Sequence, residues 1–363
     1  MASTPTSISF ARGAPSPECL DPGLVQDCAR AALERDGTTI LSYGSGGGYG
    51  PLRELLAARH DVDTGRVFIT TGGLQGFVFF AATQLQRRPG RVLVEGPTYD
   101  RPLKLLRWQG ADVVSLPMDG DGLDLDALTA ELDRGGEISF LYTIPTFQNP
   151  SGRTLGSDRR RRLAAIVAER DLDVLEDDPY GLVRYEGQAP PLLHQLEGGM
   201  RVSFTSSFSK TVAPGLRVGY VVVPNALRAG YDDRVVSTYI SPPLLPQAIV
   251  HELHANGGFA PNLERICGLL RPRRDAMLAA LEREMPDDVT WNRPEGGYFL
   301  WVDFGPRDAD ELQGRAAEAG VTFVRGTDFF PSGSGGAGAA RLAFSFETPQ
   351  RIAEGVAILA SLL

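Results

Sequence analysis

The chain has 363 residues, of which 42% are hydrophobic and 22% are charged, and its formal net charge is −9. This composition is typical of a globular protein with one large and one small domain. No basic run indicates nucleic acid, no apolar run approaches the roughly 20 residues that span a bilayer, and no secretory signal opens the chain. Three cysteines and four histidines without metal-ligand spacing predict reduced thiols, no metal site and a cytoplasmic location.

Helical and strand-like segments alternate over the first two thirds of the chain. Helical periodicity predicts helices at residues 21–35, 51–59, 77–85, 125–132 and 157–170. Short apolar runs predict strands at residues 66–70, 91–95, 112–116, 138–142, 172–177, 200–205 and 216–223. This alternation predicts an α/β domain with a mostly parallel sheet flanked by helices.

The pattern changes after the proline-rich run Ser241-Pro-Pro-Leu-Leu-Pro-Gln247. A long helix is predicted at residues 262–284, and a Ser/Gly-rich stretch at residues 332–338 predicts a flexible loop. The remaining elements indicate a smaller α+β domain, with strands at 289–291, 297–302, 321–325 and 341–345 and helices at 307–319 and 348–363. We therefore expect a large domain at residues 45–250 and a small domain formed by residues 1–44 and 251–363.

Only two of the 36 basic residues are lysines, Lys104 and Lys210. Arginine cannot form a Schiff base, so a lysine kept against this background indicates that an amine is needed. Lys210 lies in a loop between two predicted strands, whereas Lys104 lies in a helix-like segment and is expected on the surface. From the lysine alone, a catalytic amine and an ordinary loop cation are equally good interpretations.

The surroundings of Lys210 favour the catalytic interpretation. Ser207, Ser209 and Arg217 bring two hydroxyls and a guanidinium, which suit a phosphate group. A glycine turn at residues 71–76 opens a predicted helix, and such a turn offers free backbone N–H groups to an anion. A lysine beside a phosphate site suggests pyridoxal phosphate, because a lysine amine can hold its aldehyde.

The run Ser-Phe-Ser-Lys-x-x-x-Pro-Gly-Leu-Arg-x-Gly, which begins at Ser207, resembles the lysine signature of the fold-type I, class I/II aminotransferases. The resemblance is closest to the branch that holds 2-aminoadipate and kynurenine aminotransferases, and it extends from about Ile8 to the C-terminus. The runs at residues 148–152 and 177–180 also match the family. The resemblance implies an aspartate aminotransferase-like fold.

For the cofactor, the resemblance implies a role for each matched residue. Lys210 would hold pyridoxal phosphate and transfer the substrate's α-proton. Asp177 would keep the ring nitrogen protonated, while Tyr180 and Asn149 would bind the ring oxygen. Tyr99 would stack on the ring, although a core tyrosine is the alternative, and Asn149 before proline is also an ordinary turn residue.

For the substrate, the resemblance implies that Arg341 binds the α-carboxylate, with Asn149 beside it; a salt bridge at a sheet edge is the alternative for Arg341. Tyr43 would donate its hydroxyl to the cofactor phosphate of a neighbouring subunit, which implies a homodimer with shared active sites. The alternative for Tyr43 is an interface or core aromatic residue.

Three features depart from the family pattern. Arg12 stands where relatives usually have glycine, and we predict that it helps to select the substrate side chain, with a solvent-exposed side chain as an equal alternative. Gly73 stands where relatives usually have serine, which leaves the backbone amides of Gly73 and Leu74 as the phosphate contacts. A longer N-terminal helix found in many relatives is missing before Ile8.

We expect an aminotransferase that moves the amino group of an L-amino acid to a 2-oxo acid. The alternative is an enzyme with the same cofactor and fold that carries out elimination, substitution, cyclisation or oxidation. A ligand-sensing domain of a transcription regulator is less favoured, because it would need a winged helix before Ile8. The sequence does not identify the substrate side chain, and neither nucleic acid nor a membrane is an expected partner.

Overall fold

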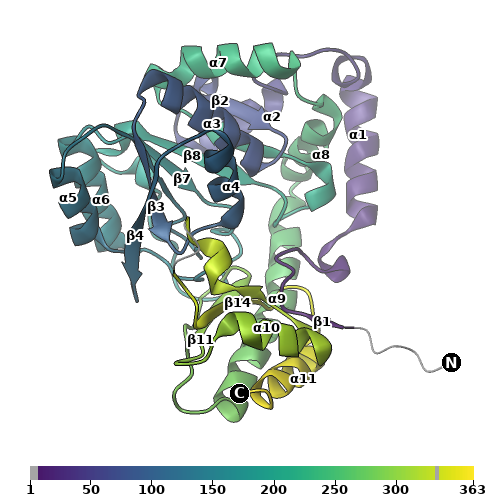
Figure 1. Ribbon diagram of the computed structural model, residues 1–363. Helices are drawn as coiled ribbons and strands as arrows, with labels where there is room; N and C mark the ends of the chain where they lie inside the picture. Colours follow the sequence, from purple (N-terminus) through teal and green to yellow (C-terminus); the bar gives the residue numbers. More distant parts are fainter. Residues whose placement is uncertain (1–6, 332–334) are drawn as a thin grey trace.

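Figure 1 shows the computed structural model of the chain, which describes residues 7–331 and 335–363. A large α/β part carries residues from the middle of the chain, and a smaller part carries the C-terminal third together with the first strand. Residues 332–334 of the predicted Ser/Gly-rich loop lie outside the described residues.

The large part is built on a sheet of eight described strands in the order β2-β9-β8-β7-β6-β3-β4-β5. The strands are β2 (Val67–Thr70), β3 (Arg91–Gly96), β4 (Val113–Asp119), β5 (Gly122–Leu123), β6 (Ile138–Thr143), β7 (Val174–Asp177), β8 (Val202–Ser207) and β9 (Gly219–Val222). The five strands from β8 to β4 are parallel, whereas β9 is antiparallel to both of its neighbours and β5 is antiparallel to β4. The predicted mostly parallel sheet is therefore confirmed.

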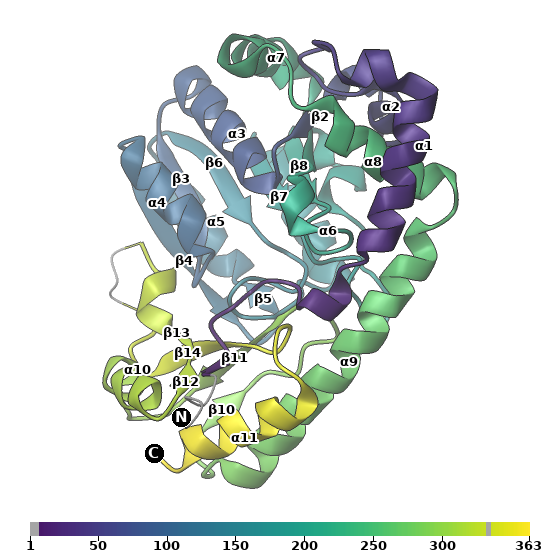
Figure 2. The ribbon, with the colours of Figure 1, turned by 90° about the vertical axis from the view of Figure 1, so that its right-hand side faces the viewer.

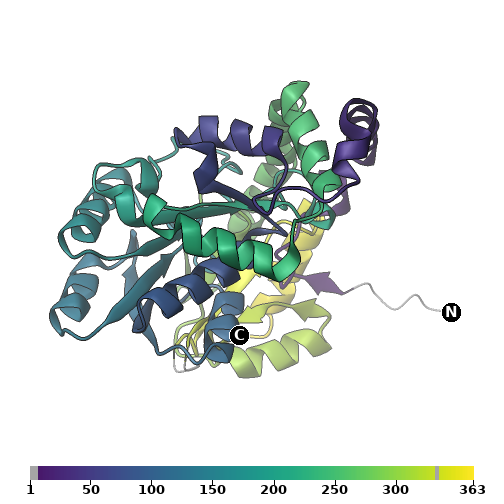
Figure 3. The same ribbon diagram turned by 90° about the horizontal axis from the view of Figure 1, so that it is seen from above.

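Helices cover both faces of this sheet (Figures 1 and 3). Alternate strand residues such as Phe68 and Val221 pack against one helical layer, and their neighbours Ile69 and Val222 pack against the other. The first layer contains α3 (Gly73–Arg87), α4 (Asp100–Trp108) and α7 (Asn225–Tyr239). The second layer contains α1 (Pro22–Ile40), α2 (Gly50–His60), α5 (Leu125–Asp133), α6 (Ser157–Glu169) and α8 (Leu244–Ala255). Burial on both faces explains why these strands read as continuous apolar runs.

The smaller part contains an antiparallel sheet in the order β10-β11-β14-β13. Its strands are β10 (Thr290–Trp291), β11 (Phe299–Asp303), β13 (Val324–Arg325) and β14 (Ala339–Ala343). A separate parallel pair joins β1 (Ile8–Ser9) to β12 (Val321–Thr322). The helices are α9 (Phe259–Glu284), α10 (Ala309–Glu318) and α11 (Pro349–Ala360), and α9 runs from the large part to the small one (Figure 2). The predicted α+β domain is confirmed.

Two helices, α7 and α8, were not predicted from the sequence. The proline-rich run before residue 247 looks like a break, but Pro246 falls in the first turn of α8. Proline is tolerated there because the first-turn N–H groups have no partner within the helix. In α7 the buried residues are Leu227, Tyr231 and Val235, a spacing of four that indicates a helix in retrospect.

The helix α1 packs against α8, and both share a core with β2 and β9. This contact favours grouping residues 22–40 with the large sheet. The predicted boundaries at residues 45 and 250 stay a prediction. Among residues 7–331 and 335–363, no helix is long and apolar enough to cross a membrane. The same residues contain no cluster of three His, Cys, Asp or Glu side chains that could hold a metal ion.

A pair of histidines, His60 and His194, packs against strands β8 and β9 of the large sheet. His60 Nδ1 and His194 Nε2 are 3.0 Å apart, and His60 Nε2 lies 2.9 Å from the Tyr220 hydroxyl. The ring of His60 also contacts Phe204, with centroids 4.8 Å apart. Burial lowers the pKa of both histidines well below the usual value, so both are neutral in the folded protein near neutral pH.

We predict that this pair makes the fold sensitive to mild acid. The unfolded chain binds protons at each histidine below about pH 6.5, whereas the folded chain does not, so stability falls as the pH drops below that value. Between about pH 7.5 and about pH 5.5 the free energy of unfolding should fall by about 1 to 3 kcal/mol from this pair. Chemical denaturation of the wild type and of His194→Gln checks this, with Lys104→Arg, a change at an exposed residue, as the control. An equal loss in all three proteins would contradict the prediction.

Candidate active site

A cavity of about 410 Å³ opens at the carboxyl edge of the large sheet, where it meets the small domain. We call it the catalytic cavity. It brings together most of the residues that the sequence singled out: Gly73, Leu74, Tyr99, Asn149, Asp177, Tyr180, Ser207, Ser209, Lys210, Arg217 and Arg341. Most of these residues end or follow β2, β3, β6, β7 and β8 or precede β9, so the topology of the large sheet gathers them at one edge, and Arg341 on β14 of the small sheet faces them.

Lys210 follows β8 in a loop and lines the catalytic cavity. Its Nζ donates a hydrogen bond to the carbonyl oxygen of Gly13 at 2.7 Å. The same atom lies 5.7 Å and 5.2 Å from the ring centroids of Tyr180 and Tyr298. Burial and, to a smaller extent, the positive charges of Arg341 and Arg217 together lower the pKa of Lys210 to about 8. A lysine with this pKa supplies an unprotonated amine close to neutral pH.

The N-terminus of α3 faces Ser207, Ser209 and Arg217. Its N-cap residue Gly72 has a φ of 82° and offers no side chain, so no side chain caps the first amides of α3. A Cβ at Gly72 would lie 2.5 Å from an Arg217 nitrogen, which shows how closely the turn and this guanidinium approach. Helix amides, a guanidinium and the hydrogen-bonded hydroxyls of Ser207 and Ser209 form a site that fits a phosphate.

Gly73 has no steric reason to be glycine. A Cβ built there would come no closer than 3.6 Å, to the carbonyl oxygen of Ser206, which is an ordinary contact. A serine would therefore fit, and its hydroxyl is a contact that this chain lacks.

Asp177 ends β7 and turns its carboxylate into the catalytic cavity. Its Oδ2 accepts a hydrogen bond from the Tyr142 hydroxyl at 2.7 Å. Burial raises the pKa of Asp177 to about 7, since no cationic side chain pairs with it among the described residues. The carboxylate of its neighbour Glu176 does not enter the cavity, because it accepts hydrogen bonds from the backbone amides of Leu193 and His194. Asp177 therefore fits a cationic group such as a protonated pyridine nitrogen.

Two tyrosines predicted to contact the cofactor border the same space. Tyr99 precedes α4, and burial raises its pKa to about 12. Tyr180 is buried against the edge of the Phe299 ring, with centroids 5.5 Å apart, and burial raises its pKa above the usual range. Both hydroxyls are therefore protonated near neutral pH and can act as hydrogen-bond donors.

Arg341 lies on β14 and is 7% exposed. It donates one hydrogen bond to Asn149 Oδ1 and another to the carbonyl oxygen of Ala11, both at 2.9 Å. Its Nε is buried without a partner, and no described carboxylate forms an ion pair with it. The guanidinium lies 4.2 Å from the ring centroid of Phe299. A buried guanidinium that is held by neutral groups can bind the carboxylate of a ligand.

Two predicted residues lie outside the catalytic cavity. Arg12 is exposed and places its guanidinium 4.6 Å from the ring centroid of Phe346, although its neighbours Ala11 and Gly13 line the cavity. Tyr43 is 84% exposed in the single chain. The proposed roles of both residues stay predictions.

Several residues of the site or its immediate surroundings were missed from the sequence. Tyr142 lies within a buried strand, where nothing in the local pattern separates a core tyrosine from a partner of Asp177. Asp100 and Arg101 also line the cavity. Because they follow Tyr99 directly in the sequence, the prediction for Tyr99 could have been extended to them. Lys104, expected on the surface, forms an ion pair with Asp100 at 2.8 Å.

Comparison with known proteins places this geometry in context. The family model described as aminotransferase class I and II matches residues 7–357. A 2-aminoadipate transaminase from Thermus thermophilus is 37% identical over 97% of this chain and 89% of its own length. The structure of an α-aminoadipate aminotransferase from Thermus thermophilus, bound to N-(5'-phosphopyridoxyl)-L-leucine, is 36% identical, covers 99% of this chain and 92% of its own, and has a TM-score of 0.92. A kynurenine aminotransferase from Pyrococcus horikoshii, bound to PMP, is 32% identical over 99% of this chain and 91% of its own, with a TM-score of 0.93.

The lowered pKa of Lys210 leads to a direct prediction. Reductive methylation with labelled formaldehyde marks both lysines of the protein freed of cofactor, and nuclear magnetic resonance then follows each signal with pH. The Lys210 signal, assigned by its loss in Lys210→Arg and thereby distinguished from Lys104 and the N-terminal amine, should titrate near pH 8. In Arg341→Gln its midpoint should rise, because one neighbouring positive charge is gone. A midpoint near the ordinary lysine value of about 10.4 would contradict the assignment.

Proposed function

Since the chain belongs to the class I and II aminotransferase family and uses pyridoxal phosphate to move the amino group of an amino acid to a 2-oxo acid, we propose that Lys210, Asp177 and Tyr180 are its catalytic residues. One observation supports this most directly. An amine with a lowered pKa and a buried guanidinium without a carboxylate partner face the same cavity. An amino acid carries both a carboxylate, which the guanidinium can bind, and an α-proton, which the amine can remove.

The chain's residues would hold the cofactor at three places. Ser207, Ser209, Arg217 and the amides of Gly73 and Leu74 would bind its phosphate. Asp177 would keep the ring nitrogen protonated, with the Tyr142 hydroxyl fixing the orientation of that carboxylate. Tyr99 would stack on the ring, and Asn149 and Tyr180 would bind the ring oxygen. When bound, pyridoxal phosphate accepts the electron pair that is left at the substrate's α-carbon.

Arg341 and Lys210 would act on the substrate itself. Arg341 would bind the α-carboxylate through paired hydrogen bonds, and Asn149 holds the guanidinium in position. The Lys210 amine would remove the proton from the α-carbon and later return a proton, which requires a pKa near the working pH. Asp100 and Arg101, which line the same cavity, would contact the substrate side chain. Arg12 would contact the substrate side chain only if its guanidinium moved away from the Phe346 ring.

An exposed apolar patch supports the proposed homodimer. Leu41, Tyr43, Val236 and Ile240 are 71%, 84%, 43% and 59% exposed. They come from the ends of α1 and α7, and a Cβ at Gly46 would touch both Val236 and Ile240, so these two residues lie together. Side chains of this kind favour a buried interface. Tyr43 within it would reach the cofactor phosphate of the partner subunit.

We also propose a cytoplasmic location. Cys19, Cys28 and Cys267 are all free thiols, and two of them are buried. Unpaired cysteines are typical of proteins in a reducing compartment.

The half-reaction tests the proposed function. The enzyme loaded with pyridoxal phosphate is given single amino acids without a 2-oxo acid, in a panel that includes dicarboxylic and aromatic side chains. We expect stoichiometric pyridoxamine phosphate and one 2-oxo acid, and none of either from Lys210→Ala. Catalytic consumption of an amino acid with the cofactor left as pyridoxal phosphate would instead support elimination, cyclisation or oxidation.

The shared active site is tested by mixing two inactive or weakened proteins. Tyr43→Phe should weaken cofactor binding by about tenfold, since it removes one hydrogen bond to a charged group. In a heterodimer, one subunit carries Tyr43→Phe and the other carries Lys210→Ala. The site of the Tyr43→Phe subunit keeps its own Lys210 and receives the Tyr43 hydroxyl from its partner. That site, which is half of the sites, should regain wild-type affinity. A hybrid no better than Tyr43→Phe, or a monomer in sedimentation, would contradict the proposal. Ile240→Asp should shift the protein towards monomer.

A further inference from the structure

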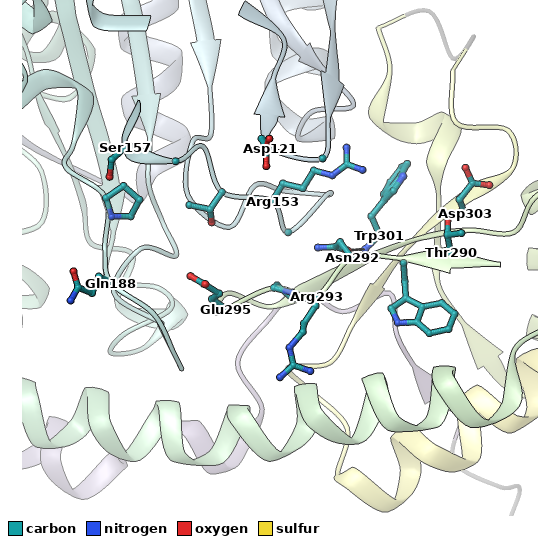
Figure 4. Close-up of a pocket in the computed structure, with 17 residues that line it drawn as sticks. Asp121, Arg153, Ser157, Gln188, Thr290, Asn292, Arg293, Glu295, Trp301 and Asp303 are labelled. Atoms are coloured by element: carbon teal, nitrogen blue, oxygen red, sulfur yellow. Dashed lines mark hydrogen bonds between the residues drawn. The ribbon is translucent and has the colours of Figure 1, made fainter. Parts of the chain in front are cut away.

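A second and larger cavity, of about 810 Å³, lies between the two domains. We call it the interdomain groove (Figure 4). The large domain lines it with the loop after Asn149, the β4–β5 hairpin and the start of α6, and the small domain lines it with β10, β11 and the turn between them. None of the residues assigned to the cofactor or the substrate lines the groove.

Arg153 stands on the large-domain side of this groove. Its backbone is fixed, because its carbonyl accepts from the Gln148 amide at 2.9 Å and its amide donates to Ser151 Oγ at 3.3 Å. Its half-buried guanidinium has no hydrogen bond or ion pair with any described residue. Asp119 is nearby, but both of its carboxylate oxygens are bound by Arg159, at 2.7 and 2.6 Å. Arg153 is thus a positioned, partly desolvated guanidinium without a protein partner.

Trp301 stands opposite, on the small-domain side. Strand alternation on β11 places Trp301 and Asp303 on the face that lines the groove, and the Arg153 side chain extends towards Trp301 (Figure 4). The indole packs edge-on against Phe329, with centroids 6.0 Å apart, and Asn292 fixes the Trp301 amide at 2.8 Å. The ring is therefore held in place, is only partly buried, and offers an aromatic surface across from the guanidinium.

The other charges of the groove limit what can bind. Arg293 points away from Arg153 in Figure 4 and lies 3.6 Å from Glu186, while Glu295 pairs with Arg184 at 2.7 Å. Asp121 and Asp303 remain as exposed carboxylates at the edges. They would repel a ligand with several negative charges, such as a phosphate ester. A single carboxylate on a flat ring can bind Arg153 and cover Trp301, and its one negative charge is repelled less by these two carboxylates.

We propose that the interdomain groove binds a small aromatic monocarboxylate, with its carboxylate on Arg153 and its ring against Trp301. The site is separate from the catalytic cavity but shares its walls. Asn149 and Phe299 line the catalytic cavity, and Arg153 and Trp301 follow them on the same loop and the same strand. A ligand in the groove would thus contact both domains beside Arg341, because Trp301 is the cross-strand neighbour of Arg341 in the small sheet.

The test uses 2-naphthoate as the probe and calorimetry of the holoenzyme. Arg341→Gln removes the carboxylate partner in the catalytic cavity, so the binding that remains reports the groove. We expect one site per chain in Arg341→Gln and an affinity lower by about tenfold or more in Arg341→Gln with Arg153→Gln. Arg153→Lys, which keeps the charge but loses the two-pronged contact, should give an intermediate loss.

Arg341→Gln with Arg293→Gln is the matched control, because it removes a guanidinium of the same groove that points elsewhere, and its affinity should be unchanged. If Arg341→Gln does not fold, the wild type replaces it, with two sites expected and one lost in Arg153→Gln. The proposal is overturned if no saturable binding is seen, if Arg153→Gln binds as tightly as its parent, or if 2-naphthylmethylammonium binds more tightly than 2-naphthoate.

Discussion

The active site depends on ionisable side chains that are held away from water by neutral partners. Lys210 donates to the Gly13 carbonyl, Arg341 donates to the Ala11 carbonyl and to Asn149, and Asp177 accepts from Tyr142. An ion pair would satisfy each charge fully and would leave nothing for a ligand to gain. Carbonyls and hydroxyls fix the side chains and leave the electrostatic attraction to the cofactor and the substrate.

The segment around residues 10–14 has a central part in this arrangement. It supplies carbonyls to Lys210 of the large domain and to Arg341 of the small domain, and the Phe10 carbonyl accepts from the Ala343 amide at 2.8 Å. The Lys210 amine and the Arg341 guanidinium are thus attached to one short stretch of backbone. Their separation is set there, although they are 131 positions apart in the chain. Gly13 fits this role because a Cβ would lie 2.7 Å from the Phe299 ring.

Much of the site could be predicted because its residues follow strand ends. Asn149, Asp177 and Lys210 come after apolar strands, and parallel strands bring their carboxyl ends to one edge. The remaining contacts depend on side chains that meet only in the folded protein. Tyr142 reads as core, and the bond from Arg341 to Ala11 joins residues 330 positions apart. The helix α8 was missed for a local reason, since Pro246 falls where a helix accepts proline.

Arg341 and Arg153 show that an unpaired guanidinium alone does not define a catalytic site. Neither has a carboxylate partner within residues 7–331 and 335–363, and they lie in cavities that share a loop and a strand. Only the smaller cavity contains an amine, Lys210, and a helix N-terminus that faces two hydroxyls and Arg217. The larger groove offers a guanidinium and a fixed indole, which can hold a ligand but have no group that moves a proton at neutral pH. The chemistry of the lining, and not the size of the cavity, therefore distinguishes the proposed catalytic site from the proposed binding site.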